Sequence, residues 1–418
     1  MLNRAITALG ITQIVGWGTT YYAPAVLAAR MTQDTGWSLT LVFAAFSWSM
    51  LVSGLVSRRL GALFDRFGAR TLMSVGSVLV AAGLALLATA HHWLQLFAAW
   101  TLLGLSMRLV LYEAAFVAIA AIAGPRARRA ISMLTLWGGL ASTVFWPVGH
   151  WLGEALGWRA TFGVYALLQL LVCLPLHLIW AGPRGGRTAH EDAGGSPAPP
   201  PANPASASPS PGAAAADTGS VPADSAWRER AIALLAAVLA ANALVFASLS
   251  AHLITVLQGL GLAAATAVAI STLKGIAQVA ARLVELGAQR WLGPIAVGVI
   301  ATAMLPLALV LLELVPPLAV PVALCCVIYG ASNGLLTIVR GAVPLALFGH
   351  QGYGTVLGRL AAPGLIAAAL APAVFAWILE RYGVRAGLGA LTVASIVSFA
   401  GMVILARSSA QNLSARNT

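Results

Sequence analysis

Long, nearly continuous apolar segments constrain this sequence more than any other feature. Such runs recur between short polar breaks, and each is long enough to cross a bilayer as a helix, which takes about 20 residues. Apolar residues make up 60% of the 418 residues and charged residues only 9%, whereas a soluble domain has about 25% charged residues. The runs lack the alternation that marks the strands of an outer-membrane β-barrel. The sequence therefore predicts an all-α membrane protein.

Twelve apolar runs can be counted, and we expect each of them to form one transmembrane helix. They cover residues 6–28, 38–57, 71–90, 94–122, 131–153, 160–181, 230–257, 263–287, 292–312, 318–345, 355–379 and 384–406. The first run could instead be a cleaved signal peptide, whose apolar core is about 7–15 residues long. We interpret it as a retained helix because it is longer than that and contains Trp17, Tyr21 and Tyr22.

The arginines predict how these helices are oriented. If the N-terminus lies in the cytoplasm, fifteen arginines fall in cytoplasmic segments and four on the outer side, namely Arg30, Arg159, Arg381 and Arg385. Such a bias is typical of membrane proteins, and it accounts for the net charge of +12 without a nucleic-acid partner. We therefore expect a multi-pass protein of the inner (plasma) membrane, surrounded by lipid, with both termini in the cytoplasm.

A segment rich in proline separates the sixth run from the seventh. It contains nine prolines among Ser, Ala and Gly, a composition that cannot bury enough apolar area to fold. We therefore predict an N-terminal six-helix bundle, a disordered cytoplasmic linker, a C-terminal six-helix bundle and a cytoplasmic tail. Their bounds are 1–181, 182–227, 228–406 and 407–418.

Several landmarks recur at one spacing in the two halves. Pro147 and Pro372 lie 225 positions apart, as do the loop glycines Gly68 and Gly293. A common spacing indicates that the two six-helix bundles are parallel repeats of one another.

The loop between the second and third runs carries the most specific motif. It reads Gly61-Ala62-Leu63-Phe64-Asp65-Arg66-Phe67-Gly68-Ala69-Arg70 and resembles the signature loop of the major facilitator superfamily, a Gly-x-Leu-x-Asp-Arg-x-Gly pattern followed by basic residues. Together with twelve spans, a central linker and the half repeat, this resemblance implies the fold of that superfamily and secondary transport by alternating access. A loop whose positive charge only orients the helices is the alternative.

The resemblance also implies a role for this loop in gating. Asp65 would contact the N-terminal end of a helix from the other half when the cytoplasmic side is closed, where the helix dipole favours a carboxylate. Gly61 would let two backbones approach closely, and Gly68 would relieve the tight turn. The implied gating residues are Gly61, Asp65, Arg66, Gly68 and Arg70. In the matching loop of the second half, Arg290 stands where Asp65 would be, so we expect that half to lack the acidic contact.

The fifth run also resembles the superfamily. It contains Trp146-Pro147-Val148-Gly149, followed at its outer turn by Gly157-Trp158-Arg159-Ala160-Thr161-Phe162. Pro147 and Gly149 permit a bend and close packing. We expect them to act in gating as a hinge rather than to contact substrate.

Charges inside the predicted spans carry most of the functional information, because a charge at bilayer depth is costly unless it is paired or hydrated. Arg108 falls near the middle of the fourth run, with Tyr112 one turn further on the same face, while Glu113 points about 140° away on a continuous helix. The superfamily resemblance places the fourth span at the central cavity, where Arg108 would bind a carboxylate in a bidentate manner. Glu113 is a candidate proton carrier. Both residues could instead form fixed salt bridges.

Other polar and aromatic residues recur on the spans that the resemblance places around the cavity. With Arg108 and Tyr112, we predict as substrate-binding residues Gln13, Trp17, Tyr21, Asn242, Tyr329 and Asn333. His252 could couple protons, because histidine titrates near neutral pH. For each of these residues, packing inside the bundle is the alternative.

The second half contains further charges inside its runs. Arg282 and Glu285 are three residues apart and could pair with each other. Lys274 could face the cavity and add to an anion site, whereas Arg340 and Arg359 have no evident partner. The cysteines Cys173, Cys325 and Cys326 lie in apolar segments without metal-binding spacing.

These observations predict a transporter rather than an enzyme. The sequence contains no paired-histidine metal motif and no phosphate-binding loop, so we expect no cofactor and no metal. The segments Gly16-Trp17-Gly18-Thr19-Thr20-Tyr21-Tyr22 and Leu111-Tyr112-Glu113 loosely resemble bacterial monocarboxylate-porter-type members of the superfamily. We therefore predict a monomer that takes up a small organic anion with protons. The alternative is efflux of a drug-like or metalloid compound by proton antiport; a membrane enzyme or a sensor is a different class.

Overall fold

The computed structural model describes residues 2–182 and 222–417, and within these ranges every regular element is a helix. The first half contains α1 (Leu2–Thr19), α2 (Ala23–Thr35), α3 (Leu39–Ala88), α4 (Trp93–Val110), α5 (Tyr112–Ala123), η1 (Gly124–Arg126), α6 (Ala127–Gly139), α7 (Ala141–Leu168), η2 (Gln169–Cys173) and α8 (Leu174–Trp180). The second half contains α9 (Pro222–Gly259), α10 (Ala264–Ala288), α11 (Pro294–Leu314), α12 (Ala319–Phe348) and α13 (Tyr353–Asn417). The predicted all-α class is therefore confirmed.

Seven helical stretches of the described chain are long and apolar enough to cross a membrane. Three of them are too long for one crossing; α3 alone has 50 residues, about 75 Å at 1.5 Å per residue. Each of the three is interrupted at a glycine with a positive φ, namely Gly68 (76°), Gly157 (77°) and Gly383 (81°), a conformation that other residues rarely adopt. Divided at these turns and at Gly124, whose φ is also positive (50°), and with α1 and α2 as the first span, the helices are consistent with the twelve predicted spans.

Four spans of the first half depart from a continuous α-helix along their length. The first stops at Thr19 and resumes at Ala23. The fourth is interrupted at Leu111, whose backbone is extended (φ −81°, ψ −166°). The fifth is divided at Leu140, between α6 and α7, and the sixth contains the π-helix η2. In the second half, α9, α10, α11 and α12 run through their described residues without such an interruption.

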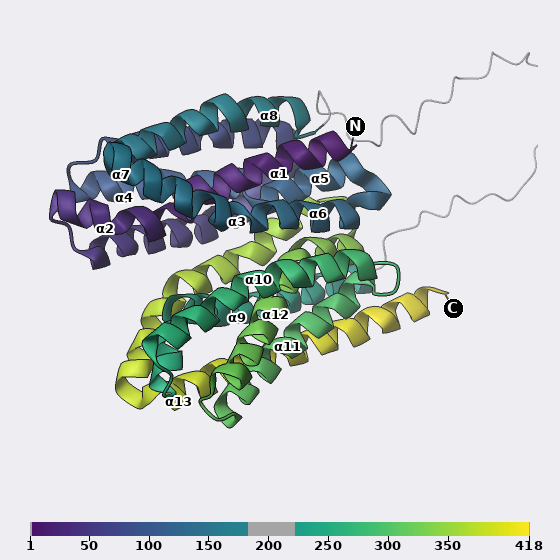
Figure 1. The fold of residues 1–418 in the computed structure, drawn as a ribbon. Coiled ribbons are helices and arrows are strands. Elements are labelled where there is room, and N and C mark those ends of the chain that lie inside the picture. Colours follow the sequence, from purple (N-terminus) through teal and green to yellow (C-terminus); the bar gives the residue numbers. More distant parts are fainter. Residues whose placement is uncertain (1, 183–221, 418) are drawn as a thin grey trace, which may run out of the picture.

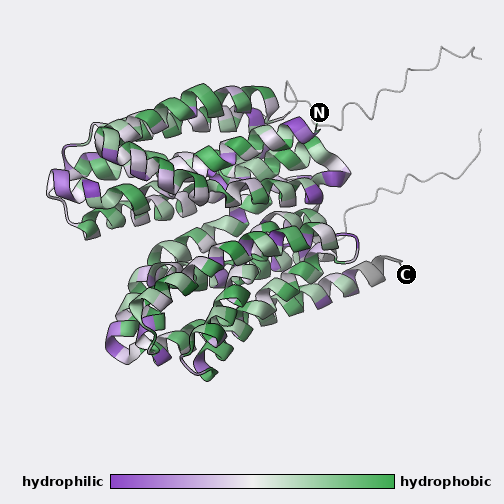
Figure 2. Ribbon diagram, in the orientation of Figure 1, coloured by the Kyte–Doolittle hydropathy of each residue, from purple (hydrophilic) through white to green (hydrophobic). Residues whose placement is uncertain are grey.

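The helices form two bundles that lie side by side (Figure 1). Buried apolar side chains of the first bundle form one cluster, which also takes in Tyr353 and Leu357 of α13, and those of the second bundle form another. Both chain ends emerge at the same end of the molecule, which we call the inner side (Figure 1). Hydrophilic residues gather at the ends of the bundles, whereas apolar residues cover most of the helices (Figure 2).

Two boundaries differ from those predicted. The predicted linker, 182–227, ends earlier than expected, because α9 begins at Pro222 and the ring of Trp227 packs against Phe348. The segment 183–221 lies outside the described residues. The predicted tail, 407–418, continues α13 as far as Asn417.

Helix packing in the two halves supports the parallel repeat. A Cβ atom on Gly104 of α4 would overlap the backbone of Ser49, and a Cβ atom on Gly330 of α12 would overlap that of Lys274. The two glycines are 226 positions apart, and the two residues they pack against are 225 apart. The same close helix contact therefore occurs once in each half.

Candidate transport site and inner junctions

On the inner side, α3 of the first half lies against the start of α13 in the second half. The carboxylate of Asp65 accepts the backbone N–H groups of Gly354 (2.9 Å) and Thr355 (2.7 Å) and the hydroxyl of Thr355 (2.5 Å). These amides belong to the first turn of α13, so Asp65 caps that helix and meets the positive end of its dipole. This contact, here called the α3–α13 junction, is the one that the superfamily motif implies.

Small residues bring the backbones of α3 and α13 into direct contact. A Cβ atom on Gly61 would overlap the carbonyl oxygen of Gly354, and a Cβ atom on Gly358 would overlap that of Ser57. Gly61 is therefore needed for close approach at this junction, as the motif implies. Gly68, whose φ is positive, forms the turn between the two spans that make up α3.

The other arginines of the inner side make local contacts. Arg66 is exposed, and its guanidinium lies 5.0 Å from the ring centroid of Phe67. Arg70 donates to backbone carbonyls at the end of α8, within the first half. Arg359, for which the sequence indicates no partner, forms an ion pair with Glu229 of α9; that expectation is therefore wrong. The gating role predicted for Arg66 and Arg70 stays a prediction.

A second junction joins α6 of the first half to α10 of the second. Glu285 is 3% exposed; its carboxylate pairs with Arg128 (3.1 Å) and accepts hydrogen bonds from the hydroxyl of Ser132 (2.8 Å) and the amide of Gln289 (3.0 Å). The second half therefore does supply an acidic contact, five residues before Arg290. The sequence did not single out Arg128 or Ser132, because no local pattern indicates a partner in the other half. We call this contact the α6–α10 junction.

Arg282 does not pair with Glu285, although the two share a helix face. It is 5% exposed and donates to the carbonyl oxygen of Thr135 at the end of α6 (2.7 Å) and to the hydroxyl of Thr337 (3.2 Å). The expected pairing is wrong because Glu285 is held by Arg128, while Arg282 donates across the junction to the backbone of α6 at Thr135. Arg282 thus links the two halves, and the oxygens that accept its hydrogen bonds are all uncharged.

Arg108 and Glu113 form an ion pair, with Arg108 Nη1 and Glu113 Oε2 2.9 Å apart. Their side chains are 6% and 21% exposed. The expectation that they point about 140° apart is wrong, because it assumes a continuous helix and the extended backbone at Leu111 breaks that helix between them. The two leading candidates for anion binding and proton coupling are therefore in direct contact.

Three of the predicted substrate-binding residues come together at the breaks in spans one and four. The ring centroid of Trp17 lies 5.2 Å from that of Tyr21 and 5.1 Å from that of Tyr112. The hydroxyl of Tyr112 donates to the carbonyl oxygen of Thr135 (3.2 Å), the same oxygen that Arg282 contacts. The aromatic residues of the first half therefore adjoin a cation of the second half.

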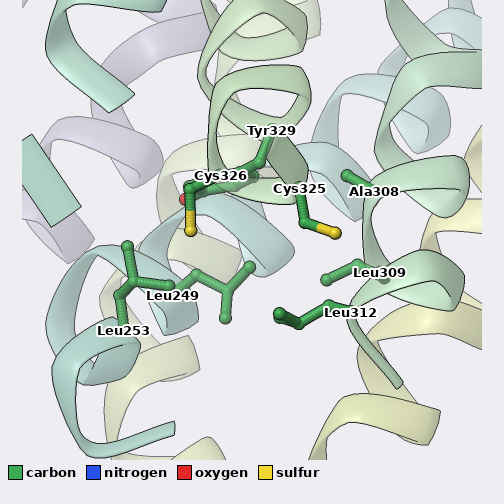
Figure 3. A pocket seen from close by; sticks show the side chains of 8 residues that line it. All are labelled: Leu249, Leu253, Ala308, Leu309, Leu312, Cys325, Cys326 and Tyr329. Carbon is green, nitrogen blue, oxygen red and sulfur yellow. The ribbon is translucent and has the colours of Figure 1, made fainter. Parts of the chain in front are cut away.

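Two further cations of the second half lack an acidic partner among the described residues. Lys274 of α10 lies 3.3 Å from the hydroxyl of Ser250 and 5.8 Å from the ring centroid of Tyr329. Arg340 lies on α12, three residues beyond Thr337, whose hydroxyl Arg282 contacts. On its other side Tyr329 borders a small apolar cavity within the second half, lined also by the two adjacent cysteines of α12 (Figure 3).

Gln13 and Asn242 are buried and hold helices together. Gln13 donates to the carbonyl oxygen of Val110 (2.8 Å), next to the break at Leu111. Asn242 donates to the carbonyl oxygen of its own helix four residues earlier (2.8 Å) and to Ser398. These contacts agree with the packing alternative, and a role in substrate binding stays a prediction.

The remaining predicted residues lie at different depths. His252 contacts the carbonyl oxygen of Pro372 (3.0 Å) within the second half. Asn333 is half-buried on α12, one turn from Tyr329. A Cβ atom on Gly149 would lie 2.6 Å from the hydroxyl oxygen of Tyr165, so this glycine makes room for a buried ring, and Pro147 lies exposed within α7.

Comparisons with known proteins agree with this architecture. The model of the Major Facilitator Superfamily matches residues 9–339, and the chain belongs to that family, whose members are transporters. Two solved structures resemble it over nearly their whole length. The human organic anion transporter MFSD10 (TETRAN) has a TM-score of 0.67 at 16% identity, covering 96% of this chain and 99% of the other. The proton:xylose symporter XylE, bound to 6-bromo-6-deoxy-D-glucose, has a TM-score of 0.67 at 12% identity, covering 97% and 94%. No curated protein sequence matches the chain.

Proposed function

We propose that the chain imports a small organic anion together with protons, through a site between its two halves. The observation that carries this proposal is an excess of positive charge there. Lys274, Arg282 and Arg340 have no acidic partner within the described residues. An unpaired cation at membrane depth is costly, so a ligand that brings a negative charge is favoured at this place.

The pair of Arg108 and Glu113 supports coupling to protons. While Glu113 is ionised, it occupies Arg108 at 2.9 Å. Protonation of Glu113 would remove that negative charge and free the guanidinium for the carboxylate of a substrate. One proton and one anion would then enter together with no net change of charge at the pair.

The distribution of contacts supports access from the outer side in this conformation. The halves meet through α3, α5 and α6 of the first and α10, α12 and α13 of the second. Of these, α5 and α6 are the inner segments of the two spans that break at Leu111 and Leu140. The α3–α13 and α6–α10 junctions would therefore have to open before a substrate leaves toward the inner side.

Proton movement in proteoliposomes tests the proposal. With a pH-sensitive dye inside and a carboxylate added outside, we expect the lumen to acidify. Glu113→Gln should abolish proton movement but retain exchange of labelled carboxylate, and Arg108→Gln should lose both. Glu154→Gln and Arg290→Gln serve as matched controls, because Glu154 lies in an exposed outer pair and Arg290 stacks on Trp291 in an exposed turn.

Other outcomes would contradict the proposal. Proton release on addition of cationic drugs, lost in Glu113→Gln, would instead establish the alternative, efflux by antiport. Unchanged carboxylate uptake in Arg108→Gln would remove Arg108 from the binding site.

A further inference from the structure

Six aromatic side chains of the first half form one continuous group beside the breaks in its helices. The members of this aromatic cluster are Trp17, Tyr21, Tyr22, Phe46, Tyr112 and Trp146. Neighbouring ring centroids are 5.1–6.4 Å apart, the range in which aromatic rings attract each other. The rings come from α1 and its connection to α2, and from α3, α5 and α7.

The aromatic cluster differs from the aromatic residues of the core. Tyr21 is 39% exposed and Trp146 is 51% exposed, whereas Trp100 and Phe116, which pack against its edges, are each 1% exposed. The indole N–H of Trp17 has no hydrogen-bond partner in the described chain. The cluster therefore has ring faces and a donor that the protein itself does not use.

Cations of the second half border the same space. Arg282 and Tyr112 donate to one carbonyl oxygen, that of Thr135. Arg340 lies on α12, three residues beyond Thr337, whose hydroxyl accepts a hydrogen bond from Arg282. Aromatic faces from one half and guanidinium groups from the other are thus brought together at the site of the proposed function.

We infer that the substrate is an aromatic carboxylate, with its ring against Trp17 and Tyr21 and its carboxylate between Arg108, which protonation of Glu113 frees, and Arg282 of the second half. The inference rests on the proposed function and names its substrate class. Stacking of one ring on another adds about two- to tenfold to affinity beyond the burial of apolar area. A saturated ring of the same size gains the burial but not the stacking, and a short aliphatic acid gains neither.

Three probes of similar size separate charge from aromaticity. They are benzoate, cyclohexanecarboxylate and benzamide, titrated into the purified full chain in lipid nanodiscs, with uptake measured in proteoliposomes. We expect benzoate to bind about two- to tenfold more tightly than cyclohexanecarboxylate and benzamide to bind weakest. The Trp17→Leu variant should remove the preference for benzoate over cyclohexanecarboxylate, because leucine offers apolar contact to either ring but no stacking surface.

Two further variants show that the ring itself is responsible. Trp17→Phe should restore the preference for benzoate, because phenylalanine retains a stacking surface. Trp377→Leu is the matched control, since Trp377 is an exposed tryptophan of α13 that contacts Tyr382 outside the aromatic cluster. If Trp17→Leu does not fold, Tyr21→Leu with Tyr21→Phe replaces that pair.

The possible results separate the inference from the proposed function. Equal binding of benzoate and cyclohexanecarboxylate would overturn the inference and leave anion transport standing. Equal binding of benzamide and benzoate would contradict anion transport itself. If none of the three binds, the inference is overturned, and uptake of short aliphatic carboxylates would then decide whether the proposed function stands.

Discussion

In the first half of the molecule, four spans depart from a continuous α-helix along their length, whereas α9, α10, α11 and α12 of the second half are continuous. The two halves also divide the charges unequally. The first half holds Arg108 and Glu113 as a pair, while Lys274, Arg282 and Arg340 of the second half have no acidic partner in the part of the chain that the structure describes. The two repeats have thus become different: the first contains interrupted helices and a group of aromatic rings, and the second contains cations without an acidic partner among the described residues.

The inner junctions show the same divergence. In the first half, the acid stands at the inner end of the second span, three residues before the turn at Gly68, and Asp65 accepts backbone amides at the start of α13. In the second half, the acid stands inside α10, and Glu285 pairs with the side chain of Arg128. A helix terminus offers its amides to any carboxylate, whereas a buried ion pair requires a particular partner. The α6–α10 junction therefore depends more strongly on a single residue.

The largest effect that we expect in testing this difference comes from Glu285→Ala. Removing one partner of a buried ion pair costs about 3–5 kcal/mol, because it leaves the other charge unpaired. We expect a clear fall in the thermal unfolding temperature and loss of transport. Glu154→Ala, in an exposed pair with Arg30 at the outer end, should cost under about 1 kcal/mol. If Glu285→Ala and Glu154→Ala lower the unfolding temperature equally, the buried ion pair of the α6–α10 junction contributes no more to stability than the exposed pair does.

A smaller effect is expected from Gly61→Ala at the α3–α13 junction. The added methyl group would overlap the carbonyl oxygen of Gly354, and such overpacking costs about 1–3 kcal/mol. We expect the inner side to open more readily, so that α13's first amides exchange their hydrogens faster. Gly163→Ala is the control, because a Cβ atom there meets nothing within 4 Å. If hydrogen exchange of these amides is unchanged in Gly61→Ala, α3 and α13 can move slightly apart without weakening the α3–α13 junction.

Removing the cap itself should have a more modest effect. Asp65→Ala takes away the acceptor of the Gly354 and Thr355 amides, and loss of a helix cap costs about 0.5–2 kcal/mol. Hydrogen exchange of these two amides should rise several-fold while the α6–α10 junction stays protected. Faster exchange at both junctions would mean that they open as one unit and that the two halves do not differ in this respect.

Some of these features follow from the sequence and others do not. Apolar runs predict the helices because burying a backbone in lipid requires internal hydrogen bonds, and the motif loop predicts the contact of Asp65. The pairing of Arg108 with Glu113 could not be predicted, because the helical periodicity used to separate them fails at Leu111. The partner of Glu285 could not be predicted either, because Arg128 lies 157 positions away in the sequence and no local pattern connects them.

The smallest effect concerns the outer turns, where the halves differ once more. Asp34 accepts hydrogen bonds from the indole of Trp158 and the guanidinium of Arg159, whereas in the second half Val384 packs on Gly259 with no charge involved. The hydrogen bond from Trp158, and then that from Arg159, lower the pKa of Asp34.

A lowered pKa in the folded protein means that ionised Asp34 stabilises the fold above its unfolded pKa of about 3.9. This contribution is lost as the pH falls through the lower folded value, so unfolding temperatures measured between about pH 5 and 3 should fall further in the wild type than in Asp34→Asn. Asp34 is exposed, so the difference will be small. Val384→Ala, which changes the outer turn of the second half, should leave the slope of stability against pH unaltered. If wild type and Asp34→Asn lose stability in parallel, the outer turn of the first half is held by the stacking of Arg159 on Trp158 rather than by the carboxylate, and the two outer turns are more alike than their residues indicate.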